Sequence, residues 1–150
     1  MTLRSAREAD LPAIIALLLD DPLGKSRERL ENPLPVIYRA AFQAMEAQGG
    51  NIYLLAERDG ILLGCLQLTL IPGISREGTT RAQVEGVRVA GAARGEGLGE
   101  RLMREAIARS RDAGARLMQL TTDHRRVDAR RFYERLGFQG SHLGMKLVLD

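Results

Sequence analysis

The run Arg-Gly-Glu-Gly-Leu-Gly at residues 94–99 constrains the fold of this chain more than any other feature. It follows a segment that reads as extended, residues 82–89, and leads directly into an amphipathic helical pattern. Alternating glycines allow a tight turn and let backbone N–H groups approach a ligand without hindrance from Cβ atoms. A helix that begins there adds unpaired N–H groups, so the run predicts an anion site, most often for a pyrophosphate. Taken alone, the run is also compatible with a turn that binds nothing.

Length and composition favour one domain over residues 1–150, because 150 residues suffice for a single core and are short for two. No apolar run approaches transmembrane length, and the first residues lack the pattern of a signal peptide. The single cysteine, Cys65, has no internal partner for a disulfide. We therefore expect a cytoplasmic protein with no membrane partner.

The net charge of +3 is unevenly distributed along the chain. Residues 76–135 hold 14 arginines against 9 acidic residues, whereas the remainder holds 8 basic and 10 acidic residues. A positive field over one region favours an anionic ligand, which leaves a nucleotide cofactor, a nucleic acid and an acidic substrate open. Nucleic-acid binding is disfavoured because the chain has only three Tyr, three Phe and no Trp to stack on bases.

The order of predicted elements excludes a regular alternating βαβ fold, because three consecutive strands are joined by short connections. Strands are predicted over residues 3–7, 51–57, 61–71, 79–89 and 116–121, with one or two closing strands between 138 and 150. Helices are predicted over residues 10–19, 33–48, 97–113 and 127–136. We expect an α/β (mixed α+β) fold with a central mixed, largely antiparallel sheet of six to seven strands and helices on both faces. Gly86, inside a predicted strand, indicates a bulge or a close backbone approach.

Three segments resemble the GCN5-related N-acetyltransferase (GNAT) family. Residues 94–99 match the Arg/Gln-x-x-Gly-x-Gly/Ala pattern of its acetyl-CoA-binding loop, and residues 129–138 resemble its Ala-x-x-Phe-Tyr-x-x-x-Gly-Phe segment. The opening Arg4-x-Ala6-x-x-x-Asp10 is similar to the usual start of the family. The resemblance covers nearly the whole chain. It implies a GNAT-like acyl-CoA N-acyltransferase fold and transfer of an acetyl group from acetyl-CoA to a primary amine of a small molecule or peptide.

Other phosphate-binding motifs fit less well. A dinucleotide-binding fold has Gly-x-Gly-x-x-Gly at its first strand–helix turn and an acidic residue about 20 positions later, which this spacing does not match. A nucleoside triphosphatase loop needs Gly-Lys-Ser/Thr, and that triplet is absent from the sequence. Coenzyme A carries a pyrophosphate and needs no metal, and no residues have metal-ligand spacing.

The resemblance also implies roles for individual residues. Glu85 is the expected general base, although a carboxylate that only pairs with an arginine or bonds within the sheet would look the same in sequence. Tyr133 is the expected acid near the sulfur of the coenzyme, the alternative being a core tyrosine with its hydroxyl at the surface. His124 or Asp123 stands where the family often has an asparagine. The residues expected to bind the coenzyme are Val87, Arg88, Val89, Arg94, Gly95, Glu96, Gly97, Leu98, Gly99, Glu100 and His124.

A protein of another class remains as an alternative: a non-catalytic domain with this fold that senses acyl-CoA or serves as an interaction module. Members of the family commonly dimerise, and the predicted strands around residues 144–148 offer an edge for a homodimer.

Overall fold

The computed structural model describes residues 1–21, 23–25 and 27–150, and they form two compact units, Met1–Gln119 and Leu120–Asp150. The first unit holds every strand assigned in the described chain, and the second holds the last helix. The single domain expected over residues 1–150 stays a prediction.

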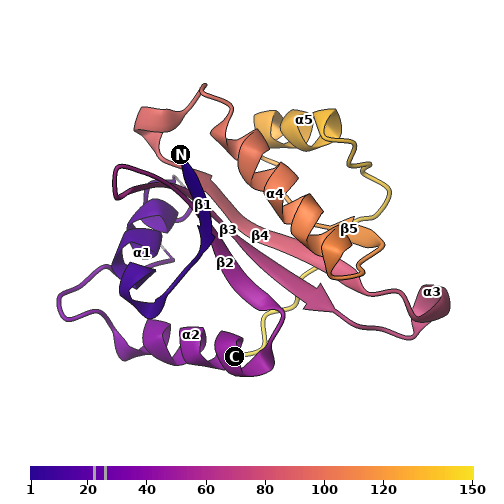
Figure 1. Ribbon diagram of the computed structural model, residues 1–150, viewed down its shortest axis with the longest axis horizontal. Helices are drawn as coiled ribbons and strands as arrows, with labels where there is room; N and C mark the ends of the chain where they lie inside the picture. Colours follow the sequence, from indigo (N-terminus) through magenta and orange to yellow (C-terminus); the bar gives the residue numbers. More distant parts are fainter. Residues whose placement is uncertain (22, 26) are drawn as a thin grey trace. The chain divides into compact units, whose positions relative to one another are not determined.

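The first unit is built around a five-stranded sheet (Figure 1). Its strands, in their order across the sheet, are β1 (Thr2–Ser5), β2 (Asn51–Arg58), β3 (Ile61–Ile71), β4 (Arg81–Val89) and β5 (Leu117–Gln119). Its helices are η1 (Glu8–Asp10), α1 (Leu11–Leu19), α2 (Val36–Gln48), α3 (Ser75–Gly78), η2 (Gly91–Ala93) and α4 (Leu98–Asp112). The first three strand pairings are antiparallel and the β4–β5 pairing is parallel. The mixed, largely antiparallel sheet is therefore confirmed.

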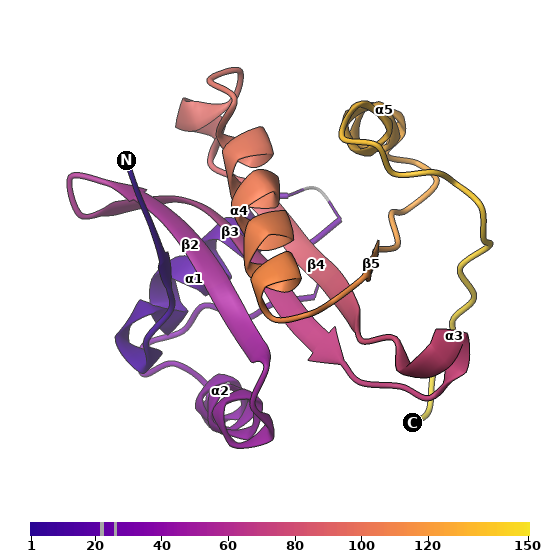
Figure 2. The same ribbon diagram turned by 45° about the vertical axis from the view of Figure 1, so that its right-hand side comes forward.

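Helices cover both faces of this sheet, as Figure 2 shows. Successive residues of a strand point to opposite faces, and β3 illustrates this. Cys65 packs with Ile14 and Leu17 of α1, whereas a Cβ on Gly64 would lie 2.8 Å from the Leu102 side chain of α4. Glycine at position 64 thus lets α4 lie close against the sheet.

Cys65 is fully buried in the cluster under α1. Burial raises the pKa of its thiol to about 12, and the charge of Arg88 opposes this shift only in part. The thiol donates a long, weak hydrogen bond to the Gly86 carbonyl, with a sulfur–oxygen distance of 3.8 Å. In the folded state this side chain therefore behaves as a small apolar residue.

The second helix begins three residues later than predicted, at Val36. Pro35 occupies the N-cap with a non-helical ψ of 135°. A residue that precedes a proline is disfavoured in the helical region, which applies here to Leu34. The two prolines of residues 33–35 therefore delay the helix.

The second unit contains α5 (Val127–Arg135), and no strand is assigned among its described residues. The prediction of one or two closing strands between 138 and 150 was wrong, and the sheet has five strands in the described chain instead of six to seven. A strand requires a neighbour that accepts and donates its hydrogen bonds, and a pattern within one segment does not report such a neighbour. No helix in the described parts of the chain is long and apolar enough to span a bilayer.

A part-buried ion-pair network fastens β1 to the start of α1. The Arg4 guanidinium donates to both carboxylate oxygens of Asp10, at 2.8 and 2.9 Å, and to Glu57 on β2 at 2.9 Å. Asp10 also accepts a hydrogen bond from the backbone N–H of Arg7 at 2.7 Å. The hydrogen bonds from Arg4 hold the pKa of Asp10 below its usual range.

We expect Asp10→Asn to lower the free energy of unfolding by about 2 kcal/mol at pH 7, since it removes a two-bond ion pair of which little is exposed. A carboxyl whose folded pKa is depressed contributes stability above its unfolded pKa, near 3.9, and loses it as the pH falls through the folded value. The difference between wild type and variant should therefore shrink towards pH 2 in urea titrations.

The matched control is Glu31→Gln, which breaks the exposed Arg29–Glu31 pair, and there the change should stay below about 0.5 kcal/mol. A difference between wild type and Asp10→Asn that stays constant from pH 7 to pH 2 would contradict the ion-pair explanation.

Candidate active site

The N-terminus of α4 presents unpaired backbone donors. Gly97 is the N-cap, in the left-handed conformation with φ +75°, and the first intrahelical bond runs from the Arg101 N–H to the Gly97 carbonyl at 3.1 Å. The N–H groups of Leu98, Gly99 and Glu100 therefore have no acceptor within the helix. Together with the positive end of the helix dipole, these groups are suited to bind an anion, and the anion site predicted there stays a prediction.

The loop before this helix is open around its glycines. Gly95 has φ +83° and Gly97 has φ +75°, a region that side chains with a Cβ rarely adopt. Apart from the adjacent residues in the chain, no heavy atom of the described residues lies within 4 Å of the position that a Cβ would take at either glycine. Gly99 differs from the other two because it lies in the first turn of α4. The tight turn thus depends on Gly95 and Gly97, and a ligand can approach both.

The acidic side chains of this region are paired with arginines. Glu96 accepts a hydrogen bond from Arg58 at 2.8 Å, and Glu100 pairs with Arg104, one turn along α4, at 2.6 Å. Because these carboxylates are neutralised, the free N–H groups keep their preference for an anion. The Arg94 guanidinium is directed to the Asp20 carbonyl at 3.4 Å, so it ties the loop to the end of α1.

A β-bulge distorts β4 just before this loop. Between the pairs Cys65–Arg88 and Gln67–Glu85, β3 has one residue and β4 has two, one of which is Gly86 with φ +59°. The bulge predicted from Gly86 is confirmed. A bulge bends the strand and increases its twist, which turns β4 away from the regular sheet at this point.

Beyond the bulge, one edge of β4 is open. In the described chain β5 pairs only with residues Arg81–Gln83 of β4. The Ala90 N–H donates to the Leu63 carbonyl of β3 at 2.8 Å. Because successive N–H groups of a strand point to opposite edges, the Val89 N–H points to the open edge. This direction suits the coenzyme contact that the resemblance implies for Val89, which stays a prediction.

Glu85 is exposed and held by a row of amide side chains. Its Oε1 accepts a hydrogen bond from Gln83 Nε2 at 2.7 Å, and Gln83 Oε1 accepts one from Gln119 Nε2 at 2.9 Å. Glu85 pairs with Gln67 across the ladder, which places it on the face of the sheet that α1 covers. The carboxylate is thus oriented and open to solvent, as a general base requires.

Tyr53 on β2 is a site residue that the sequence did not reveal. Its hydroxyl lies 3.5 Å from the position of a Cβ on Gly86, so the phenol sits under the bulge. Burial, followed by the Cys65 thiol and the carboxylates of Glu28 and Glu85, raises the pKa of Tyr53 above its usual range. The alternation of residues 51–57 could have shown that Tyr53 points inward, but not what it would meet.

The Arg88 side chain crosses to the end of α1. It donates to the Val87 carbonyl at 2.9 Å and lies 3.7 Å from Asp21, while its buried Nε has no hydrogen-bond partner among the described residues. The Arg88 guanidinium is therefore engaged at the end of α1, and the coenzyme contact expected of Arg88 stays a prediction.

In the second unit, Tyr133 lies on α5 between two aromatic rings. Its ring centroid is 5.2 Å from that of Phe132 and 5.8 Å from that of Phe138, and the Phe138 N–H donates to the Tyr133 carbonyl at 3.1 Å. The predicted motif Phe-Tyr-x-x-x-Gly-Phe thus forms one aromatic cluster. It fixes the ring of Tyr133, which is half-buried within the chain.

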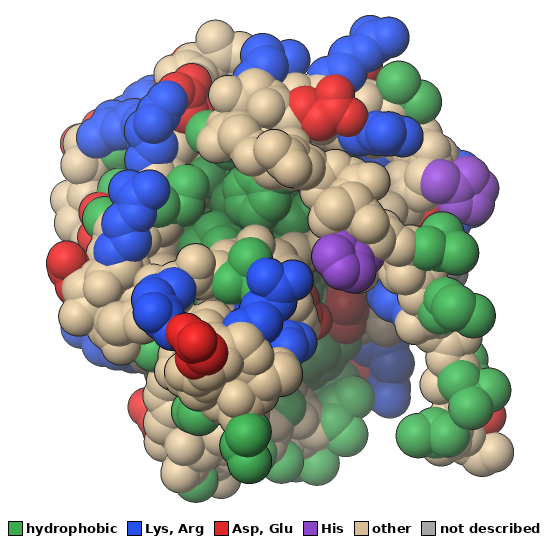
Figure 3. All heavy atoms as spheres, turned by 90° about the vertical axis from the view of Figure 1, so that its right-hand side faces the viewer, with side chains coloured by type: hydrophobic (Ala, Val, Ile, Leu, Met, Phe, Trp, Pro, Cys, Tyr) green, Lys and Arg blue, Asp and Glu red, His purple; other side chains and the backbone are tan. Residues whose placement is uncertain are grey.

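The His124 side chain is 94% exposed, with Nδ1 3.8 Å from Asp123. Figure 3 shows both histidines of the chain, His124 and His142, at the surface. Hydrogen bonds from Arg125 hold the pKa of Asp123 well below its usual range. Asp123 is therefore committed to Arg125, which leaves His124 as the better replacement for the asparagine of the family.

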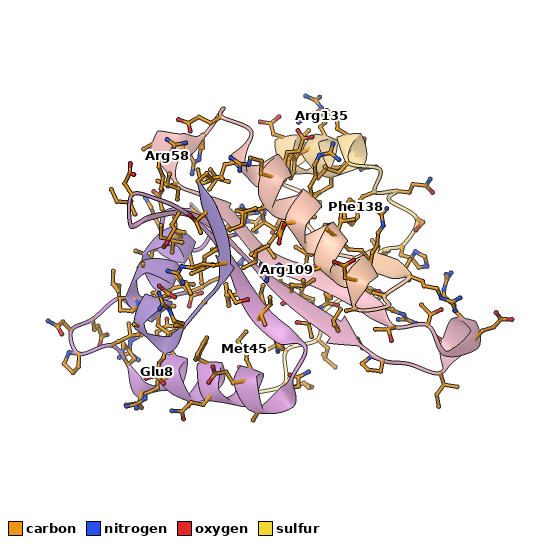
Figure 4. All side chains as sticks on the ribbon, viewed as in Figure 1. Glu8, Met45, Arg58, Arg109, Arg135 and Phe138 are labelled. Atoms are coloured by element: carbon orange, nitrogen blue, oxygen red, sulfur yellow. The ribbon has the colours of Figure 1, made fainter. Side chains whose placement is uncertain are left out.

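The first unit therefore brings together Glu85, the edge at Val87–Val89 and the loop 94–100, whereas Tyr133 and His124 belong to the other unit. A separate apolar cavity of about 140 Å³ lies between β2, β3 and the Arg109 side chain, which Figure 4 labels. None of these predicted site residues lines that cavity.

A sequence model of the acetyltransferase (GNAT) family matches residues 12–138 of the chain. The chain belongs to the GNAT family. The resemblance found in the sequence is thereby confirmed, and acetyl transfer is the general activity that membership supports. Proteins of the GNAT family use acetyl-CoA, and the free N–H groups and open glycine positions of this loop fit a pyrophosphate of that kind.

Relatives support the same assignment. An aminoalkylphosphonate N-acetyltransferase from Salmonella typhimurium is 30% identical over 141 residues, which are 93% of this chain and 86% of that protein. The crystal structure of a transcriptional regulator from Bacillus halodurans C-125 is 45% identical, with a TM-score of 0.95 and 99% of both chains covered. A candidate acetyltransferase from Agrobacterium tumefaciens C58 is 28% identical, with a TM-score of 0.87 over 99% of this chain and 100% of that one. The GNAT-like fold is confirmed.

Proposed function

We propose that this protein transfers the acetyl group of acetyl-CoA to the primary amine of a small molecule by direct attack in a ternary complex. The observation that carries the proposal is the combination, within one unit, of an open β4 edge with the free N–H groups that follow it at α4. An extended arm can pair with such an edge while its diphosphate is bound at the helix N-terminus.

Different residues are proposed to bind different parts of the coenzyme. The backbone of Val87–Val89 binds the arm, and the N–H groups of Gly95–Glu100 bind the diphosphate. His124 is proposed to contact the coenzyme at the position where the family often has an asparagine. No group of three or more metal-ligating side chains occurs in the described part of the chain, and the proposed chemistry calls for no metal.

Acetyl-CoA supplies an activated acetyl thioester, and the chain must do three things. An ammonium ion has no lone pair, and free alkylamines titrate near 10.4, so Glu85 is proposed to accept a proton from the amine, directly or through water. The Val89 N–H is proposed to donate a hydrogen bond to the oxygen that gains charge. Tyr133 is proposed to give a proton to the departing thiolate.

The amine acceptor is proposed to be small and to carry an acidic group. The Salmonella relative is named for aminoalkylphosphonates, and the half of this chain that holds the glycine loop has a surplus of arginine. Aminoalkylphosphonates are therefore the first acceptors to test, followed by amino acids, polyamines and peptide N-termini.

Two measurements test the proposal. Isothermal calorimetry should show acetyl-CoA binding, and a thiol-release assay over the amine panel should show turnover with at least one acceptor. Absence of binding at millimolar acetyl-CoA would overturn the proposal at its first step.

A non-catalytic acyl-CoA sensor is the second candidate, and one observation favours it: the Bacillus halodurans relative is named a transcriptional regulator. A sensor would bind acetyl-CoA and acetylate no amine in the panel.

Tyr133→Phe is expected to lower kcat by about 10- to 100-fold, because it removes a positioned proton donor. The phenylalanine ring can keep the contacts with Phe132 and Phe138, so the thermal unfolding midpoint and the Kd for acetyl-CoA should stay near wild type. Steady-state kinetics and calorimetry check this. An unchanged kcat would assign Tyr133 to the aromatic cluster alone.

A further inference from the structure

Three side chains of different charge follow one another along one face of β4. Ala82 and Val84 are buried. Strand alternation therefore puts Arg81, Gln83 and Glu85 together on the other face. The register with β3 is regular from Arg81 to Glu85, so no bulge interrupts this alternation. A guanidinium, an amide and a carboxylate thus form a line that ends at the proposed base.

The sheet beside this line is polar. Asn51, Thr69 and Gln119 lie next to Gln83 in one row across four strands. The Thr69 hydroxyl donates a hydrogen bond to Asn51 Oδ1 at 3.2 Å, and Gln119 donates one to Gln83 at 2.9 Å. Elsewhere on this face Cys65 packs in the apolar cluster under α1. A row of uncharged polar side chains near the proposed base suits a polar ligand that lies along the face.

Arg81 has no anionic partner in the described chain. Its guanidinium donates to the Ser75 hydroxyl at 3.0 Å, and no carboxylate of the described residues forms an ion pair with it. By contrast, Arg58 at the glycine loop pairs with Glu96. A guanidinium has five N–H donors in a planar fork that matches the oxygens of a carboxylate or a phosphonate. Arg81 therefore keeps donors for an anion, with the Ser75 hydroxyl beside them.

We propose that Arg81 binds the acidic group of the amine acceptor while Glu85 receives its amine. The carboxylate attracts an ammonium ion and repels an anion, and the guanidinium does the reverse, so the two ends of the line orient such a molecule. Gln83 lies between them and adds no charge. This inference rests on the proposed acetyl transfer and adds to it the residue that selects an acidic acceptor.

The spacing of the two ends limits the acceptor. Four residues of a strand span roughly 13 Å, which is the separation of the Arg81 and Glu85 Cα atoms. The Arg81 side chain reaches Ser75 at the start of α3, on the chain before β4. One carbon between the amine and the acidic group is too short to reach both side chains. The expected class is therefore a primary amine whose acidic group is several bonds away.

Arg81→Met tests the contact in steady-state kinetics with 4-aminobutylphosphonate and butylamine, which differ in the acidic group. The variant should lower kcat/KM for the phosphonate by about 30-fold or more, and most of the change should lie in KM, because a binding contact is lost. For butylamine kcat/KM should stay within about twofold, which also shows that the variant is folded. Arg81→Lys should recover part of the loss, since it keeps the charge without the fork.

Two further comparisons sharpen this test. Arg111→Met removes the same charge from an exposed arginine on α4, and it should leave kcat/KM for both amines within about twofold of wild type. In the wild type kcat/KM should rise at least about tenfold from aminomethylphosphonate to 4-aminobutylphosphonate. This rise should disappear in Arg81→Met, because the longer spacer helps only when its acidic group reaches the guanidinium.

Binding separates this inference from the proposed function. Calorimetry with 4-aminobutylphosphonate in the presence of coenzyme A measures affinity without turnover. Binding that Arg81→Met weakens, in a protein that acetylates no amine, would overturn the acetyl transfer and support the Arg81 contact. The inference itself is overturned if the phosphonate neither binds nor reacts, or if Arg81→Met leaves its binding and turnover unchanged. A wild-type preference for the one-carbon acceptor, or an equal loss of activity with butylamine in Arg81→Met, would overturn it too.

Discussion

Gly97→Val is expected to weaken acetyl-CoA binding by about 100-fold. Gly97 has φ +75°, and a β-branched residue is strained there, so the loop must move away from its present path. Loss of two hydrogen bonds to a charged ligand costs about 3 kcal/mol, which corresponds to a factor of about 100 in Kd. Isothermal calorimetry measures the change directly.

Gly114→Val provides the matched control at the other end of α4. Gly114 has φ +88° and, as at Gly97, no heavy atom of the described residues beyond its chain neighbours lies within 4 Å of its Cβ position. Both substitutions should therefore destabilise the fold by a similar amount, about 1–2 kcal/mol. Only Gly97→Val should impair coenzyme binding. If both variants bound acetyl-CoA equally well, the diphosphate would not lie at the start of α4.

Glu85→Gln is expected to lower kcat/KM by about 100- to 1,000-fold at neutral pH, the usual contribution of a positioned general base. The amide is close in size to the carboxylate and can still bond to Gln83, but it cannot accept the proton of an ammonium ion. As the pH approaches 10, more of the amine is already neutral and needs no general base to remove its proton. The difference between wild type and variant should therefore narrow with rising pH in steady-state kinetics.

The control for this prediction is Glu46→Gln, an exposed carboxylate on α2, which should leave kcat/KM within about twofold of wild type. Should Glu85→Gln also stay within twofold at pH 7, Glu85 is a carboxylate that only bonds within the row of amides, and another group must take the proton.

Glycine made the bulge in β4 and the turn before α4 predictable from sequence. Gly86, Gly95 and Gly97 each adopt positive φ, and few other residues tolerate that conformation. A bulge and a helix N-terminus are local structures, so the residues that form them are neighbours in the chain.

The other side of the site depends on contacts between residues far apart in sequence. Tyr53 meets Gly86, and Arg88 meets Asp21, across 33 and 67 positions. Alternation gives the face on which a strand residue lies, but strand register and helix packing decide which side chains meet. No pattern in a single sequence reports those distances.

The number of strands was overestimated for a related reason. Residues 143–149 show the alternation of apolar and other side chains that is typical of a strand. That pattern describes a property of this one segment. Pairing is a property of two segments, and the described chain gives this one no neighbour. A sequence can therefore predict that a segment is able to pair without predicting that it does so within its own chain.

The inaccessibility of Cys65 has a practical consequence for the bench. A disulfide reagent that detects released coenzyme A reacts with thiolates. The thiol of Cys65, the one cysteine of the chain, is buried, and its raised pKa keeps it protonated at neutral pH. The colour that develops during turnover should thus come from product alone, with no background from native enzyme. In denaturant the same reagent measures the rate of unfolding, because each molecule that unfolds exposes one reactive thiol.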